Sequence, residues 1–176
     1  MTREVLEGVA AELAEAVSDL SESRLRLPAM LVLYAGIDIM ASLDRPESSL
    51  EAKRSDFIKW TDRYVLPGAH LACSAEDLYA ARCGLLHTYM AESRLSREGK
   101  ARQIWYAWGD ARPEDLQAII DRADVPPAAA VHFDDLSAAF GLGIERFKQS
   151  ILDHAEKAHL VYERAGKCFG NLSPSQ

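Results

Sequence analysis

The segment LPAMLVLYAGIDIMASL at residues 27–43 constrains the fold of this chain more than any other stretch. Asp38 is its only charged residue. The segment is shorter than the roughly 20 apolar residues that a bilayer-spanning helix needs. Apolar side chains would surround it on all sides as a helix, and Pro28 suits a first helical turn. We therefore expect a helix from Pro28 to about Leu43 at the centre of a soluble core, and no membrane segment.

Apolar residues recur at three- and four-residue spacing in several other segments, which is typical of amphipathic helices. Ser49 is a candidate N-cap for the third of these helices, and Asp134 or Asp135 for the last. Gly141 and Gly143 would kink or interrupt the last helix near its start. The amphipathic helices are expected at residues 2–24, 50–66, about 75–95 and 136–169.

Residues 100–133 do not share the helical periodicity of the rest of the chain. The run at 101–108 is rich in β-branched and aromatic residues and ends at a glycine, which indicates a strand. Pro113 opens a short helix to about Ala123, and residues 130–133 allow a second strand. The sequence thus predicts a mainly α protein, a bundle of four to five long helices with a small two-stranded β insertion.

The chain is long enough for one substantial domain, which we place at residues 1–170, with a disordered tail at 171–176. The chain has 48% hydrophobic and 27% charged residues, as soluble globular proteins do. Three widely spaced cysteines make no disulfide framework, and the acidic N-terminus has no secretory signal. We expect a cytoplasmic protein.

The charge of the chain is unevenly distributed. A net charge of −7 argues against broad electrostatic binding to nucleic acid. Residues 82–102, however, carry a local excess of positive charge, which is compatible with a phosphate-binding site and equally with a solvated helix end. The cations of this segment are Arg82, Arg94, Arg97, Lys100 and Arg102, against Glu92 and Glu98.

The stretch DLYAARCGLLHTYM at residues 77–90 places Arg82 and His87 among apolar residues, followed by Tyr89. Arg82 and His87 are five residues apart, which on an ideal helix is roughly 140° of rotation and about 7.5 Å of rise. Within one straight helix they do not point at the same spot. They would border a shared site if Gly84 loosened the turn or if a second copy of the chain completed the site.

This stretch resembles the signature of the HEPN superfamily, an arginine followed after four to six residues by a histidine. The fuller pattern Arg-x4-His-x-Tyr of HEPN toxins is met by Arg82, His87 and Tyr89. The resemblance covers about ten residues closely. The family usually has Asn, Asp or His directly after the arginine, and this chain has Cys83.

The resemblance implies a compact helical homodimer in which two Arg/His motifs face each other. Many such proteins are RNA endonucleases, in toxin, stress or defence settings, that need no metal or other cofactor. RNA is then the implied ligand, and an antitoxin or an enzyme that modifies Tyr89 is a further candidate partner. His87 would be the acid and base, and Arg82 would bind the phosphate, with Tyr89 and Cys83 as supporting residues. The residues expected to seat the RNA backbone are Arg94, Arg97, Lys100 and Arg102.

Two other functions stay open from the residues alone. One is a non-catalytic homodimeric module that binds a nucleotide, RNA or a protein partner through the same groove. The other is a structural homodimer in which Arg82 and His87 pair with acidic residues across an interface. A zinc site at His70, Cys73, Cys83 and His87 ranks lower, because about ten residues of helix between the cysteines span roughly 15 Å.

Overall fold

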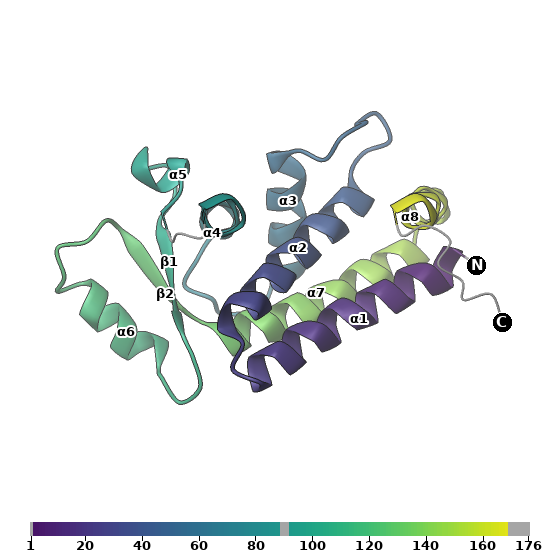
Figure 1. The fold of residues 1–176 in the computed structure, drawn as a ribbon. Coiled ribbons are helices and arrows are strands. Elements are labelled where there is room, and N and C mark those ends of the chain that lie inside the picture. The colour runs from purple at the N-terminus through teal and green to yellow at the C-terminus, as the bar shows by residue number, and fades with distance from the viewer. Residues whose placement is uncertain (1, 89–91, 169–176) are drawn as a thin grey trace.

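The computed structural model of the protein describes residues 2–88 and 92–168, without the side chains of Thr2, His87, Thr88 and Cys168. These residues form a mainly helical protein with one small parallel sheet, as expected (Figure 1). The elements are α1 (Thr2–Glu22), α2 (Arg26–Asp44), α3 (Arg54–Trp60), the π-helical turn η1 (Thr61–Val65), α4 (Ala75–Thr88), α5 (Arg94–Arg97), β1 (Gln103–Ala107), α6 (Pro113–Ile120), β2 (Ala128–His132), α7 (Phe133–Leu152) and α8 (Ala155–Cys168).

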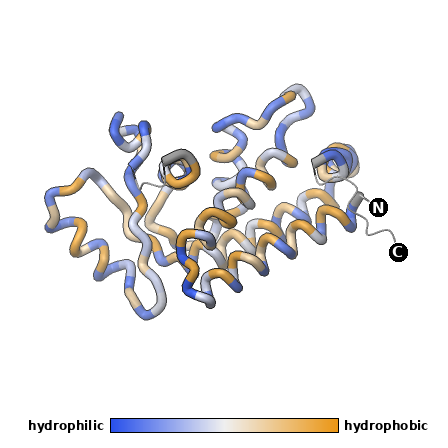
Figure 2. Tube along the Cα trace, in the orientation of Figure 1, coloured by the Kyte–Doolittle hydropathy of each residue, from blue (hydrophilic) through white to orange (hydrophobic). Residues whose placement is uncertain are grey.

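The helix α2 is the centre of the core, as its composition predicts. Leu33, Tyr34, Ile37 and Met40 are completely buried. Hydrophobic residues follow most of α2, whereas hydrophilic residues alternate with them along α1 and α7 (Figure 2). By length and composition alone α2 could also cross a membrane, but this is weak evidence because the buried core helix of a soluble protein has the same properties.

Aromatic side chains fill the space between α2, α7 and the helical segment of α3 and η1. Trp60 lies in edge contact with Phe140 and Phe147, and all three rings are fully buried. Burying a Phe side chain contributes roughly 1.5–3 kcal/mol each, so this cluster is a large part of the core. Gly36 permits the close approach of α2 and α7, because a Cβ there would come within 2.6 Å of the Phe140 ring.

The two strands and α6 form a β-α-β unit at the end of the molecule away from α8 (Figure 1). The strands are parallel, with Gln103 opposite Ala128 and Ala107 opposite His132. One face of the sheet packs on α6 through Ile120, and the other joins the main core through residues such as Ile104. A hydrogen bond between the hydroxyls of Tyr34 and Tyr106 also links α2 to β1.

The third helix begins later than expected. Ser49 does not cap it; its hydroxyl donates to the carbonyl of Glu51 within a turn. The helix α3 starts at Arg54 because the Asp56 carboxylate accepts a 2.8 Å hydrogen bond from the backbone N–H of Lys53. The single helix expected at 75–95 is also wrong, since the described residues place a separate short helix α5 after Ser93, whose hydroxyl caps it.

The last helix is broken at Asp153 and His154 rather than at the glycines. Its N-cap is His132, whose Nδ1 accepts a hydrogen bond from the N–H of Asp134, so neither expected aspartate is the cap. The helix α7 continues through Gly143, where the lack of a side chain lets the backbone of η1 pack closely against it. A Cβ at Gly143 would lie 3.1 Å from the carbonyl oxygen of Tyr64 in η1.

Candidate functional site

The helix α4, which carries the Arg82–His87 motif, lies between α3 and β1 and is seen along its axis in Figure 1. Its start is fixed by a reciprocal cap between Ser74 and Asp77. The N–H of Ser74 donates to the Asp77 carboxylate over 3.1 Å, and the N–H of Asp77 donates to the Ser74 hydroxyl over 3.2 Å. This cap defines where α4 begins, and so it sets the positions of Arg82 and His87 along the helix.

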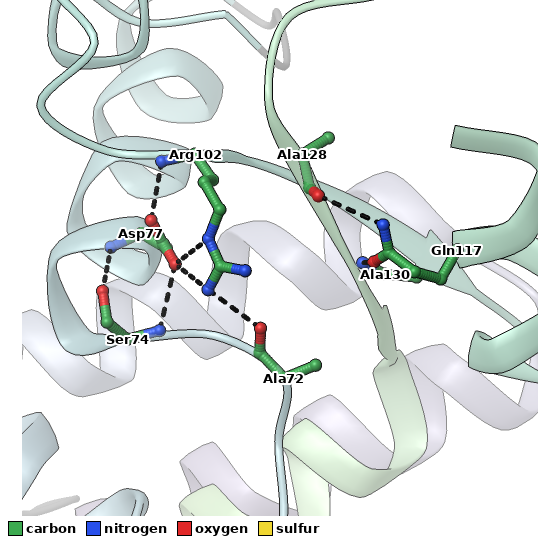
Figure 3. Close-up of polar contacts among 7 residues, drawn as sticks. All are labelled: Ala72, Ser74, Asp77, Arg102, Gln117, Ala128 and Ala130. Atoms are coloured by element: carbon green, nitrogen blue, oxygen red, sulfur yellow. Dashed lines mark hydrogen bonds and ion pairs between the residues drawn. The ribbon is translucent and has the colours of Figure 1, made fainter. Parts of the chain in front are cut away.

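Asp77 also anchors the strand β1 to this helix (Figure 3). Its carboxylate accepts hydrogen bonds from the backbone N–H, Nε and Nη2 of Arg102, at 2.7, 3.1 and 2.8 Å. Arg102 also donates to the carbonyl of Ala72. Asp77 is nearly completely buried, so its charge is compensated by this cluster of donors.

Arg82 is held by Asp38, the one charged residue of the apolar segment. Nε of Arg82 donates to Oδ2 of Asp38 over 2.6 Å. The two side chains retain 22% and 30% of their exposure, so the pair lies at the boundary between core and solvent. Asp38 therefore fixes the motif arginine from the neighbouring helix α2.

Charge and burial act against each other at Arg82. Burial opposes the guanidinium charge, but the hydrogen bond and negative charge of Asp38, with a smaller contribution from Cys83, raise the pKa of Arg82 overall. Burial, followed by a hydrogen bond with the Cys83 thiol, raises the pKa of Tyr79. Cys83 thus contributes to the pKa shifts of both Tyr79 and Arg82.

Arg82 lines a pocket of about 310 Å³ that lies where α2, α4 and the start of α3 meet. The helix α3 contributes Arg54, and Lys53 precedes it. The guanidinium carbons of Arg54 and Arg82 lie 5.5 and 6.0 Å from the ring centre of Tyr79. The two cations therefore share one aromatic ring.

The pocket is basic although the chain as a whole is acidic. It is lined by three cations, Lys53, Arg54 and Arg82, and by one carboxylate, that of Asp38. In the part of the chain that the structure describes, no carboxylate lies within 4.0 Å of the Lys53 ammonium or the Arg54 guanidinium. Both residues are exposed. This excess of positive charge suits an anionic ligand.

Two residues of the motif cannot be placed in this pocket. The backbone of His87 belongs to α4, but its side chain lies outside the described part of the structure, and Tyr89 lies outside it entirely. Because α4 is helical from Ala75 to Thr88, the separation of roughly 140° and about 7.5 Å between Arg82 and His87 applies to this helix.

The other cations expected to bind phosphate all lie next to carboxylates. Arg94 and Lys100 pair with Glu98, and Arg97 lies 3.7 Å from Glu92. These three are surface pairs, which contribute little and exchange readily with solvent and ligands. Arg102 differs, because it forms an ion pair with the nearly buried Asp77. Its first role is therefore to anchor β1.

Arg82 is the only lining residue of this pocket that the sequence predicted as a site residue. The charged and aromatic lining residues that it did not predict are Asp38, Lys53, Arg54 and Tyr79. The basic pair Lys53–Arg54 stands in a mixed acidic and basic run that has no motif. Asp38 interrupts an apolar segment, and that interruption is the sequence signal that points to it. A charged residue in a core helix needs a partner, and Arg82 is the partner.

The zinc alternative includes His87, whose side chain lies outside the described part of the structure. The described residues contain no group of three or more His, Cys, Asp or Glu side chains placed to hold a metal ion. Cys73 is half-buried, and burial raises the pKa of its thiol to about 12. A thiol with such a pKa stays protonated at neutral pH.

Comparisons of the chain with protein-family models, with curated proteins and with solved structures find no match. The resemblance to the HEPN superfamily therefore depends on the residues of the α4 motif alone.

Proposed function

We propose that this protein is a HEPN-type RNA endonuclease that acts as a homodimer and uses no metal ion. The observation that carries the proposal is the position of Arg82 on the wall of an open basic pocket, where Asp38 holds its Nε at 2.6 Å. A guanidinium on a pocket wall can meet a ligand, whereas one buried in the core cannot. The phosphodiester is the ligand that suits it best, because arginine binds phosphate with several donors.

The geometry of the helix supports the homodimer. Arg82 and His87 occupy positions roughly 140° apart around α4, and this separation favours a site to which two copies of the helix contribute. A second copy related by twofold symmetry brings a second α4 to the first. The arginine of one copy and the histidine of the other then share a cleft.

The proposed reaction uses the nucleophile that RNA itself carries. The ribose 2′-oxygen attacks the adjacent phosphorus, the P–O5′ bond breaks, and a 2′,3′-cyclic phosphate and a 5′-hydroxyl form. His87 of one copy accepts the proton of the 2′-hydroxyl, and His87 of the partner subunit donates a proton to the leaving 5′-oxygen. Arg82 stabilises the negative charge that builds up on the phosphate oxygens.

A second candidate function is RNA or nucleotide binding without cleavage. Asp38 favours it, because its carboxylate already neutralises part of the Arg82 charge and repels an approaching phosphate. Cys83 favours it as well, since the position after the arginine usually carries a polar side chain in the resembled family. In such a module, substitution of Arg82 would abolish ligand binding, whereas substitution of His87 would leave it unchanged.

The test is cleavage of total RNA by the purified protein in EDTA. Replacing His87 with Ala is expected to lower the cleavage rate by a factor on the order of 10² to 10⁴, with an unchanged circular dichroism spectrum. His159→Ala is the matched control, because His159 is an exposed histidine on α8.

The outcomes separate the two functions. Equal cleavage by the wild type and by His87→Ala contradicts the proposal. RNA that is bound but left intact by the wild type supports the non-catalytic module. A monomeric mass in light scattering at assay concentration would also contradict the shared cleft.

A further inference from the structure

We infer that Arg54 and Lys53 form a second phosphate subsite beside Arg82, which binds the neighbouring phosphate of the same RNA strand. The inference rests on the proposed function in that it takes RNA as the ligand of the pocket. It adds residues from α3 and the turn before it to a site that the motif places on α4 alone.

The position of Tyr79 carries this inference. The guanidinium groups of Arg54 and Arg82 come from different helices and meet at the same ring, at 5.5 and 6.0 Å from its centre. They are therefore no farther apart than these two distances taken together. Two guanidinium groups that share one ring can contact the same strand of RNA.

The ring that the two arginines share is held by its packing. Tyr79 packs edge-on against Phe57, with ring centres 5.3 Å apart, and Phe57 is fully buried. The Asp38 carboxylate fixes Arg82 on the same pocket wall. A site whose cations are ordered before the ligand arrives loses less conformational entropy on binding.

The charge of Arg54 and Lys53 also distinguishes them from the other cations near α4. Among the described residues, the charged groups of Arg94, Arg97, Lys100 and Arg102 each lie within 4.0 Å of a carboxylate, and those of Arg54 and Lys53 do not. A phosphate at this place would neutralise exposed positive charge and release counterions.

The experiment measures binding separately from cleavage. A short 2′-O-methyl RNA oligonucleotide lacks the 2′-hydroxyl nucleophile, so its affinity is measured by fluorescence anisotropy over a range of salt concentrations. Arg54→Ala is expected to weaken binding on the order of tenfold. The slope of log affinity against log salt should fall by about 0.7, the value for one lost contact to a single strand.

Arg63→Ala is the matched control for Arg54→Ala. Arg63 is also exposed and also lies over a tyrosine ring, 5.3 Å from the centre of Tyr64, but it lines a different pocket. Both variants remove one positive charge and one cation–π contact from the chain. Only Arg54→Ala should change the affinity and the salt slope.

A second pair of variants tests the role of the ring. Tyr79→Phe keeps the ring and should bind like the wild type, whereas Tyr79→Leu removes it and should weaken binding severalfold. Equal losses in both would assign the effect to the hydroxyl and overturn the role given to the ring.

The inference and the proposed function fail in different ways. If Arg54→Ala and Arg63→Ala bind the oligonucleotide with the same affinity and the same salt slope, the second subsite is wrong, even if natural RNA is cleaved. If binding depends on Arg54 but natural RNA stays intact, the subsite stands and the nuclease proposal fails. A wild-type protein that does not bind the oligonucleotide overturns the subsite.

Discussion

The carboxylate of Asp38 on α2 accepts a 2.6 Å hydrogen bond from Nε of Arg82 on α4, across 44 positions of sequence. Asp38 is the one charge in the most apolar segment of the chain, and Arg82 is the cation of the motif that resembles the HEPN signature. The core helix thus contributes the residue that orients the candidate site. The pair lies at the edge of the core, where it is both ordered and open to the pocket.

The Asp38–Arg82 pair should show measurable coupling. Both side chains are partly exposed, so solvent reduces their interaction, and we expect a coupling energy of about 1 kcal/mol. The measurement is a double-mutant cycle with Asp38→Ala, Arg82→Ala and the double variant, followed by urea unfolding. Strictly additive losses would show that the two side chains do not stabilise each other.

The two glycines of α7 should respond oppositely to alanine. Gly143→Ala brings a Cβ to 3.1 Å from the Tyr64 carbonyl, so we expect a loss of about 1 kcal/mol or more in unfolding free energy. A Cβ at Gly141 would meet no atom within 4 Å, so Gly141→Ala should gain roughly 0.5–1 kcal/mol from helix propensity. Thermal unfolding of both variants tests the pair, and a gain for Gly143→Ala would contradict the packing argument.

Gln117 should protect the free edge of β2 (Figure 3). Its Oε1 accepts a 2.9 Å hydrogen bond from the N–H of Ala130, and its Nε2 donates to the carbonyl of Ala128. Gln117→Ala leaves the Ala130 N–H without this acceptor, at a cost of about 1–2 kcal/mol. Amide hydrogen exchange at Ala130 should then accelerate; an unchanged exchange rate would show that the side chain does not protect this edge.

Stability should fall at alkaline pH partly because of Cys73. Burial raises the pKa of its thiol in the fold to about 12, from an ordinary value of 9.0. The unfolded chain therefore loses this proton first, so the stabilisation is full below about pH 9 and declines as the pH rises toward 12. The decline due to Cys73 approaches about 1.4 kcal/mol for each pH unit.

The comparison with Cys73→Ala isolates the thiol. Burial also raises the pKa values of Tyr34 and Tyr106, and these groups contribute to the decline in both proteins. Urea unfolding near pH 8 and near pH 10.5 should therefore show a smaller loss for the variant. Parallel losses in the two proteins would mean that the thiol ionises as easily in the fold as in the unfolded chain.

Substitution of Arg102, which anchors β1, should destabilise the protein more than substitution of Arg94, which is a surface charge. Arg102→Ala removes both side-chain hydrogen bonds to Asp77 and keeps only the one from the backbone N–H, so the unfolding free energy should fall by about 1–3 kcal/mol. Arg94 is largely exposed, and Arg94→Ala should change stability by less than about 0.5 kcal/mol. Urea unfolding of both variants measures the two losses. Equal losses of unfolding free energy would contradict the anchoring role of Arg102.

The sequence predicted those features that depend on neighbours along the chain. The apolar run of α2, the amphipathic period of α1 and the proline at the start of α6 each appear as elements near the expected positions. Such features need only short-range hydrogen bonds and the burial pattern of one helix.

The tertiary structure decided what depends on distant contacts. Gly143 remains inside α7 because the backbone of Tyr64 packs against it, although the local propensity of glycine favours a break. Asp38 meets Arg82, and Arg54 meets Tyr79, only because α2, α3 and α4 pack together. The motif predicted one arginine of the pocket, Arg82. The remaining pocket residues come mainly from other helices, and no periodicity in the chain records which helix faces will meet.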